Sequence, residues 1–269
     1  YREKIAKSND LKSIYDFLGL IDITFAKIDC LKNIAQTTMP KIFNLEEYDN
    51  IFLDIKNMWV FLPNNLGRSI PNSLHLGTNE RFNFKNACIV SPVAAGKTLL
   101  LASIMTNIFL SYIGVVCADE YAASDFSMIL DFLSIEYVLG SGISKHLAET
   151  QSIQAITSIL KKVPGKKIVF IDELHSGTYK TLVYEAQLDL PNILKDKDTI
   201  VFLTTHVPEV ASFIQKKELS TGLFYLEVLY KGDFDFIPTY RLNHHNPQHN
   251  WWLDPKKQKI QESYVHYLR

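Results

Sequence analysis

The sequence is poor in cysteine, in net charge and in long uncharged apolar runs. Its three cysteines, Cys30, Cys88 and Cys117, are odd in number, far apart and set among apolar residues, which predicts buried reduced thiols in a cytosolic-type compartment. A net charge of −1 argues against a broad basic surface, so contacts with nucleic acid are expected mostly on segments outside this chain. No signal peptide opens the chain and no membrane partner is expected, which predicts a cytoplasmic location, or a nuclear or organellar one in a eukaryotic cell.

The bulk composition predicts an ordinary soluble chain. Of the 269 residues, 47% are hydrophobic and 21% are charged, enough to bury a sizeable core in one large domain or in one domain with an appendage. The chain opens with Tyr1 rather than methionine, so we expect it to be a piece of a larger protein.

The stretch over residues 87–113 predicts a strand, a phosphate-binding loop and a helix. Its loop consists of Ser91, Pro92, Val93, Ala94, Ala95, Gly96, Lys97 and Thr98. These residues match the second half of the P-loop pattern, in which backbone amides cradle phosphates, the lysine reaches the β/γ oxygens and the hydroxyl binds Mg²⁺. Ser91 replaces the leading glycine, and the fixed φ of Pro92 could make a related turn at some strain. The alternative is a chance Gly-Lys-Thr at an ordinary helix start.

The first thirty residues predict a long amphipathic helix that starts at Asp10 and ends before Pro40. Apolar residues recur there in steps of three and four, namely Leu11, Ile14, Leu18, Ile21, Phe25, Ile28 and Leu31. The spacing is heptad-like. It leaves two alternatives, a helix that packs on the core and a lever or coiled-coil arm that projects from it.

Shorter patterns predict the remaining elements. The alternation of Ile51, Leu53 and Ile55 indicates a strand, and residues 61–66 and 71–79 indicate turns. Further along, the patterns predict a buried strand at 115–118, a helix from Ser144 to about Val163, and a hairpin of residues 223–229 and 234–242. The polar segment 243–252 with His244, His245 and His249 is interpreted as a solvated loop rather than a metal site.

Two further strands end in residues that carry chemistry. The apolar run 167–171 ends in Asp172 and Glu173, and the run 199–205 ends in His206. Open α/β sheets bind ligands at the carboxyl ends of such strands. With a phosphate loop upstream, Asp172 fits a magnesium-binding Walker-B aspartate, Glu173 fits a residue that polarises water, and His206 fits a neighbour of the γ-phosphate. The alternatives are solvated turn carboxylates and a structural histidine.

Together these segments resemble the ATPase domain of the MutS mismatch-repair family. The resemblance rests on the loop 91–98, on Asp-Glu-Leu-His-Ser-Gly-Thr at 172–178 and on Thr-Thr-His at 204–206, and it covers most of the chain. In that family the corresponding patterns read G-P-N-M-x-G-K-S and D-E-[LI]-G-x-G-T, followed by T-H. The helix near residues 28–35 is similar to the helix that joins the lever and clamp region of the family to its ATPase.

The resemblance implies an α/β fold of the P-loop, ABC-type ATPase class, with a mainly parallel sheet flanked by helices. Residues 1–45 would then be the joining helical segment and residues 46–269 the ATPase domain. ATP and Mg²⁺ are the implied cofactors, held by the loop 91–98, with Thr98 and Asp172 at the metal, and Glu173 and His206 are the implied catalytic residues. Asn64 is similar to a residue beside the adenine, and Ser144 matches the signature serine that completes the site of a second MutS-like subunit.

Several residues depart from the family pattern, and they shape the function that we expect. Ser91 and Val93 replace a glycine and an asparagine of the loop, residues 145–147 replace T-F-M, Leu182 replaces an aspartate, and residues 56–59 replace G-R-H-P. The expected function is an ATP-hydrolysing dimer switch of a divergent MutS-like protein, coupled to DNA through domains outside this chain. The alternatives are a nucleotide-binding dimerisation module with weak or no hydrolysis and an unrelated P-loop kinase.

Overall fold

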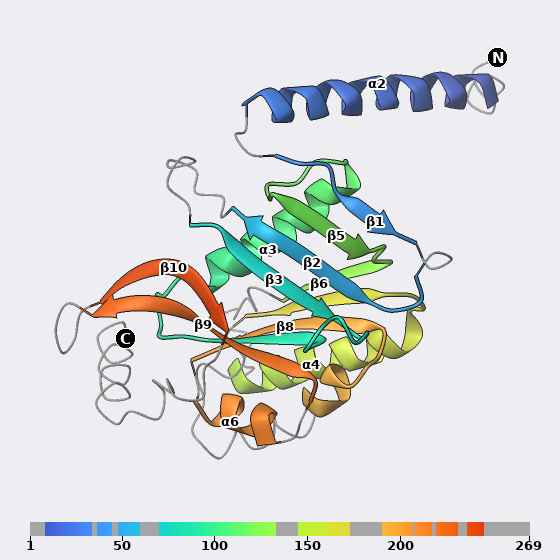
Figure 1. Ribbon diagram of the computed structural model, residues 1–269. Helices are drawn as coiled ribbons and strands as arrows, with labels where there is room; N and C mark the ends of the chain where they lie inside the picture. Colours follow the sequence, from blue (N-terminus) through green and yellow to red (C-terminus); the bar gives the residue numbers. More distant parts are fainter. Residues whose placement is uncertain are drawn as a thin grey trace.

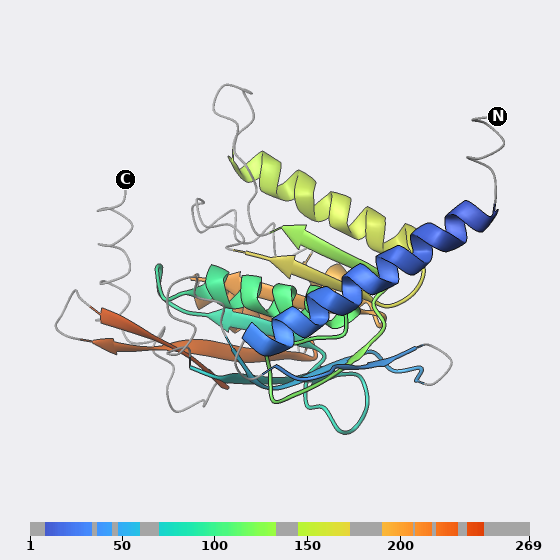
Figure 2. The same ribbon diagram turned by 90° about the horizontal axis from the view of Figure 1, so that it is seen from above.

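The computed structural model describes residues 9–33, 37–44, 48–59, 70–132, 145–172, 190–206, 208–216, 219–230 and 236–244. Within these residues, two β-sheets enclose one helix, and further helices cover the outer face of the larger sheet (Figures 1 and 2). The arrangement is a mixed α/β fold.

The larger sheet has six strands in the order β10-β9-β4-β8-β7-β6. Every neighbouring pair is parallel except β9 with β10. Strands β4, β7 and β8 are buried along their whole length, as expected for continuous apolar runs inside a parallel sheet covered on both faces. The strands are β4 (Asn86–Val90), β6 (Met128–Phe132), β7 (Lys167–Ile171), β8 (Thr199–Thr205), β9 (Thr221–Tyr230) and β10 (Phe236–His244).

A second sheet of four strands, in the order β1-β5-β2-β3, was not anticipated from the sequence. Its strands are β1 (Lys41–Phe43), β2 (Phe52–Met58), β3 (Asn72–Gly77) and β5 (Glu120–Ser124). The turn expected at 71–79 is wrong for 72–77, because Leu74 and Leu76 alternate with exposed residues and bury one face of β3. The strand expected at 115–118 is also wrong. Val116 makes only an isolated bridge to Thr38.

Helix α3 (Lys97–Tyr112) lies between the two sheets (Figures 1 and 2). Its buried residues Leu101, Ile104 and Ile108 share one hydrophobic cluster with residues of both sheets. Gly114 follows the helix with φ 84°, the left-handed conformation in which a glycine commonly ends a helix. The helix therefore has packing partners on two opposite sides.

The opposite face of the six-stranded sheet is covered by α4 (Lys145–Lys162), α6 (Pro208–Lys216) and the helical residues 190–194. Ile153, Ile156 and Leu160 of α4 pack against Val169 and Ile171 of β7 in a second hydrophobic cluster. Helix α4 ends before Pro164-Gly165, as the sequence predicts, and Gly165 has φ 88°. The main sheet is thus buried on both faces.

Helix α2 (Asn9–Asn33) lies apart from both sheets, at the top of Figure 1. Most of its apolar side chains are exposed, including Ile14, Tyr15, Phe17, Leu18, Leu20, Ile21, Ile23, Phe25 and Ile28. It approaches the body near Gly114, where an added Cβ would lie 2.5 Å from Nζ of Lys27. This exposure contradicts a helix packed on the core and agrees with a projecting arm. Among the residues described, no helix is both long and apolar enough to cross a membrane.

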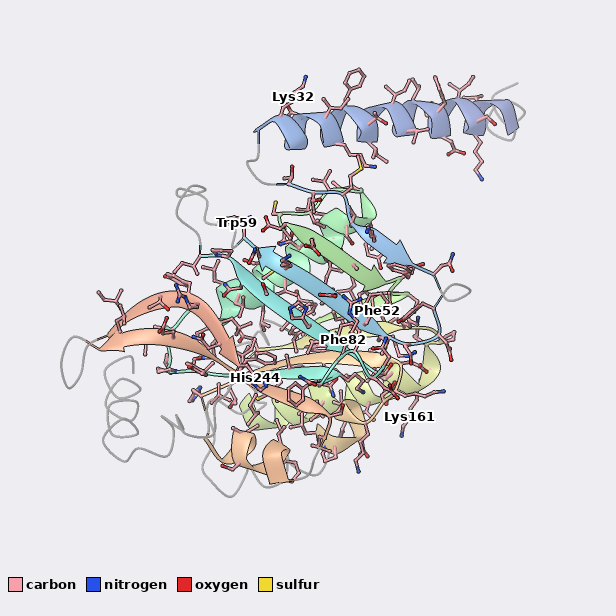
Figure 3. The ribbon with its side chains drawn as sticks, viewed as in Figure 1. Lys32, Phe52, Trp59, Phe82, Lys161 and His244 are labelled. Carbon is pink, nitrogen blue, oxygen red and sulfur yellow. The ribbon has the colours of Figure 1, made fainter. Side chains whose placement is uncertain are left out.

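The structure also tests the predicted hairpin and the predicted state of the cysteines. Strands β9 and β10 pair antiparallel, which confirms the hairpin. Cys88 and Cys117 are buried free thiols, and burial raises the pKa of the Cys88 thiol to about 12. In the four-stranded sheet, Phe52 of β2 stacks on Phe82, with 5.8 Å between ring centroids (Figure 3).

Candidate functional site

Three strand ends bring the predicted site residues to one edge of the six-stranded sheet. Strand β8 lies between β4 and β7, and Val90 is in register with Thr205. The amide of Ser91 donates to the carbonyl of Thr205 (3.3 Å). The loop 91–96 after β4, Asp172 after β7 and His206 after β8 therefore lie at the carboxyl edge of the sheet, where open α/β sheets place their ligands.

The backbone of the loop has two residues with positive φ. Ala94 has φ 65° and Gly96 has φ 96°, and the amide of Ala95 donates to the carbonyl of Pro92 (3.3 Å). A non-glycine residue in this conformation costs about 1–2 kcal/mol, and such strain gathers at ligand sites. Gly96 caps α3 without a side chain, so the amides of the first helical turn border the loop. This backbone can receive an anion.

Lys97 lies under the loop rather than in solvent. Its side chain is 3% exposed, and Nζ donates to the carbonyls of Ser91 (3.1 Å) and Pro92 (2.9 Å). The ammonium group of Lys97 is thus hydrogen-bonded to backbone carbonyls of the phosphate loop itself.

Asp172 connects the loop to β8 through two hydroxyl groups. Thr98 Oγ1 donates to Asp172 Oδ2 (2.5 Å), and Thr204 Oγ1 donates to Asp172 Oδ1. Thr98 is exposed, whereas Thr204 is completely buried. The contact of Thr204 with Asp172 was not predicted from the sequence, although a hydroxyl one residue before the end of a neighbouring strand is a usable signal.

Ser91 stands where the loop pattern has its leading glycine, and the positive φ of the loop falls on Ala94 and Gly96 instead. The φ of Ser91 is not among the positive ones, and its buried hydroxyl donates to the carbonyl of Val90 (2.7 Å) and accepts from the amide of Leu226 in β9 (2.7 Å). The serine therefore fastens the start of the loop to the hairpin.

Two residues of the site were missed by sequence reasoning. A Cβ added to Gly96 would lie 2.7 Å from ring atoms of Tyr240 in β10, so this ring packs directly on Gly96. Asn72 of β3, 3% exposed, donates from Nδ2 to the carbonyl of Tyr240 (3.0 Å) and accepts from the amide of Leu242 (2.7 Å). No local pattern indicates a contact between residues 72 and 240, because it depends on long-range strand pairing.

The residues that would hold a magnesium ion fit its chemistry. Mg²⁺ prefers hard oxygen ligands and is commonly bound by one or two carboxylates together with phosphates of the substrate. Thr98 and Asp172 supply a hydroxyl and a carboxylate within hydrogen-bond distance of each other. Across the described residues no group of three or more histidine, cysteine or acidic residues could hold a metal ion.

Several predicted residues lie outside the described ranges. These are the implied catalytic Glu173, the adenine neighbour Asn64, the signature Ser144, Leu182, and the histidines His245 and His249. His244 belongs to β10 and stacks on Phe84, with 5.1 Å between ring centroids (Figure 3). The loop expected over 243–252 is therefore wrong for its first two residues.

Fold and site together define a class: an α/β protein whose main parallel sheet carries, at its carboxyl edge, a glycine–lysine–threonine loop beside a carboxylate. Comparison with known proteins then shows which members of this class the chain is similar to. No family model matches the chain. It is 26% identical over 219 residues to the endonuclease MutS2 of Alkaliphilus oremlandii, covering 79% of the chain and 25% of the relative. It is 27% identical over 190 residues to endonuclease MutS2 of Lactobacillus acidophilus (67% and 22%) and 27% identical over 246 residues to that of Lactobacillus johnsonii (87% and 28%).

These similarities show that the chain is related to the MutS family. The chain spans about a quarter of the length of the curated relatives that it matches.

Proposed function

We propose that this chain is the ATP-binding and ATP-hydrolysing domain of a divergent MutS-like DNA-repair protein. Its nucleotide state would act as a switch between two paired subunits, coupled to DNA held by domains outside the chain. In this proposal residues 1–45 join a lever region to the ATPase of residues 46–269. The relatives are named endonucleases, and the proposal for these residues is restricted to nucleotide binding and hydrolysis.

One observation carries the proposal: the hydrogen-bonded chain from Thr98 through Asp172 to Thr204, beside a loop that holds Lys97. A hydroxyl and a carboxylate in this relation, next to backbone amides and a buried ammonium group, make a site for a metal-bound phosphate chain.

Each residue then has a task that follows from its place. Lys97 exchanges the carbonyls of Ser91 and Pro92 for phosphate oxygens, since ammonium groups prefer charged acceptors. Backbone amides at 96–98 would receive the remaining oxygens. Bound Mg²⁺ would neutralise charge on the phosphates and would be held by Thr98 and Asp172.

Other predicted residues would carry out the hydrolysis of the bound nucleotide. Glu173 would orient the attacking water and accept its proton, and His206 would contact the γ-phosphate. Asn64 would lie beside the base. Ser144 of a second MutS-like subunit would complete the site, as a helix N-terminus can bind phosphate.

Lys97→Ala tests the proposal. A hydrogen bond to a charged group contributes about 1.5–3 kcal/mol. The ATP affinity measured by calorimetry should therefore fall by about tenfold to hundredfold. Lys195→Ala, which removes an exposed lysine, is the matched control and should bind like the wild type. Unchanged ATP affinity in Lys97→Ala would overturn the assignment of the loop.

A second candidate function is a nucleotide-binding dimerisation module with little turnover. It is favoured by Ser91 and Val93, since the serine hydroxyl serves β9 and valine has no polar group for phosphate. Single-turnover hydrolysis at saturating protein separates the two functions. If the chain is an ATP-hydrolysing switch, bound ATP should be converted to ADP. If it is a dimerisation module, ATP should bind tightly and no ADP should form.

A further inference from the structure

Thr204 lies on the α3 face of the six-stranded sheet, one residue before the end of β8. Earlier in this strand, Ile200 and Phe202 belong to the hydrophobic cluster that contains α3, whereas Val201 belongs to the cluster on the opposite face. Because side chains alternate along a strand, the side chain of Thr204 points toward α3 as well. Its hydroxyl is thus a polar group that follows an apolar row of the strand.

Asp172 reaches the same place from the neighbouring strand. Ile171 of β7 is in register with Leu203 of β8, so Asp172 lies beside Thr204. The amide of Asp172 donates to the carbonyl of the last residue of β6 (3.3 Å). This bond continues the strand pairing by one residue, so both the backbone and the carboxylate of Asp172 are held by neighbouring strands.

The two oxygens of this carboxylate have different partners. Thr204 Oγ1 donates to Asp172 Oδ1, and Thr98 Oγ1 donates to Oδ2. Thr204 is completely buried, whereas Thr98 is exposed in the first turn of α3. The bond to Oδ1 is therefore shielded from water, and Oδ2 is the oxygen next to the phosphate loop.

We propose that Thr204 is a positioning residue that determines which cation the site accepts: by occupying Oδ1 of Asp172, its hydroxyl leaves one carboxylate oxygen for the ion that accompanies the nucleotide. The inference rests on the proposed function and adds the choice of cation to it. Mg²⁺ is small, requires near-octahedral geometry and keeps several waters, whereas Ca²⁺ takes about six to eight oxygens, often including both oxygens of one carboxylate. A carboxylate with one available oxygen therefore favours Mg²⁺.

Thr204→Val tests this inference, because valine is close to threonine in shape and lacks the hydroxyl. The measurement is the calorimetric affinity for Mg·ATP and for Ca·ATP, each at saturating cation. A hydrogen bond to a charged group changes an equilibrium constant by about tenfold or more. The preference for Mg·ATP over Ca·ATP should therefore fall by about tenfold in Thr204→Val. Thr204→Ser keeps the hydroxyl and should retain the preference of the wild type.

Thr199→Val is the matched control. Thr199 begins β8 and is also completely buried, but its hydroxyl has no hydrogen-bond partner among the described residues. The control should keep both affinities. An unchanged ratio of the two affinities in Thr204→Val would overturn the proposal even if both fell, because Thr204 would then have a structural role alone. An equal change of the ratio in Thr199→Val would also overturn it.

A second measurement needs no nucleotide. Urea unfolding compares Thr204→Val, Asp172→Ala and the double variant, and the double variant should lose less stability than the two single variants together, because both remove the same hydrogen bond. Additive losses would overturn the proposed hold of Thr204 on the carboxylate. Failure of the wild type to bind either Mg·ATP or Ca·ATP would overturn the proposed function instead, and the urea measurements would still decide whether Thr204 holds Asp172.

Discussion

At the scale of single residues, Ser91 shows how one hydroxyl joins a loop to a neighbouring strand. Its Oγ is the acceptor for the amide of Leu226, and both groups are buried. We predict that Ser91→Ala lowers the free energy of unfolding by about 1–3 kcal/mol, because a buried amide loses its partner. Urea unfolding measures this. Ser73→Ala is the matched control, because the Ser73 hydroxyl also accepts from a backbone amide, that of Asn57 (3.0 Å), but at an exposed position where water can replace it. It should destabilise the protein less than Ser91→Ala, and an equal effect of both variants would contradict the prediction.

Asp172 allows a second prediction at this scale. Its carboxylate accepts hydrogen bonds from Thr98 and Thr204, and an amide in its place can accept at only one atom and binds cations poorly. In Asp172→Asn the gain in ATP affinity caused by Mg²⁺ should therefore be largely lost. Calorimetry with Mg²⁺ and with a chelator measures that gain. Asp131→Asn, on the neighbouring strand β6, should retain it, and a full magnesium effect in Asp172→Asn would place the metal elsewhere.

At the scale of elements, lysines close the amino-terminal edge of the six-stranded sheet, opposite the nucleotide loop. Lys85 donates to the carbonyl of Asp196, Lys166 to those of Tyr48 and Asn50, and Lys167 to those of Val163 and Gly165. All three are nearly completely buried. Burial lowers the pKa of Lys85 to about 8 and also lowers that of Lys166.

The lowered pKa of Lys85 predicts how stability depends on pH. Between about pH 8 and the ordinary lysine value of 10.5, the unfolded chain binds the proton that the folded chain has lost, so the contribution of Lys85 to the free energy of unfolding should rise with pH. The raised pKa of Cys88 contributes in the opposite direction above its ordinary value of 9.0, so the effect of Lys85 is the difference between the wild type and Lys85→Met. Urea unfolding from pH 7.5 to 10 measures the rise. It should be smaller in Lys85→Met and unchanged in Lys195→Met, whose lysine is exposed. Parallel curves for wild type and Lys85→Met would contradict the prediction.

Elements with local signatures could be predicted from the sequence, and those made by distant pairing could not. Continuous apolar runs indicated β4, β7 and β8, and the helix end predicted at about Val163 agrees with α4, which ends at Lys162. The four-stranded sheet escaped, since β3 begins at Asn72 directly after Pro71 and reads as a turn. The loop and Asp172 were predicted as candidate site residues because each belongs to a local sequence pattern. Asn72 and Tyr240 were not predicted, because their contact exists only in the folded chain.

At the scale of the whole molecule, α2 contributes little to the core. Most of its apolar side chains are exposed, and an arm of this kind is expected to need a covering segment elsewhere. We predict that a chain starting at residue 37 unfolds cooperatively with a free energy within about 1 kcal/mol of the full chain and associates less at high concentration. Urea unfolding and sedimentation measure both. A loss of several kcal/mol on removal would show that α2 packs on the body.

Helix α3 has one end at the loop and the other beside α2. Sixteen residues at about 1.5 Å each make a rod of roughly 24 Å, with Lys97 at its start and Gly114, which faces Lys27, just past its end. Because close-packed interiors resist compression and α3 is packed between two sheets, the rod cannot absorb a push by bending. A shift of α3 along its axis at the phosphate loop would therefore move Gly114 relative to Lys27 at the other end of the helix.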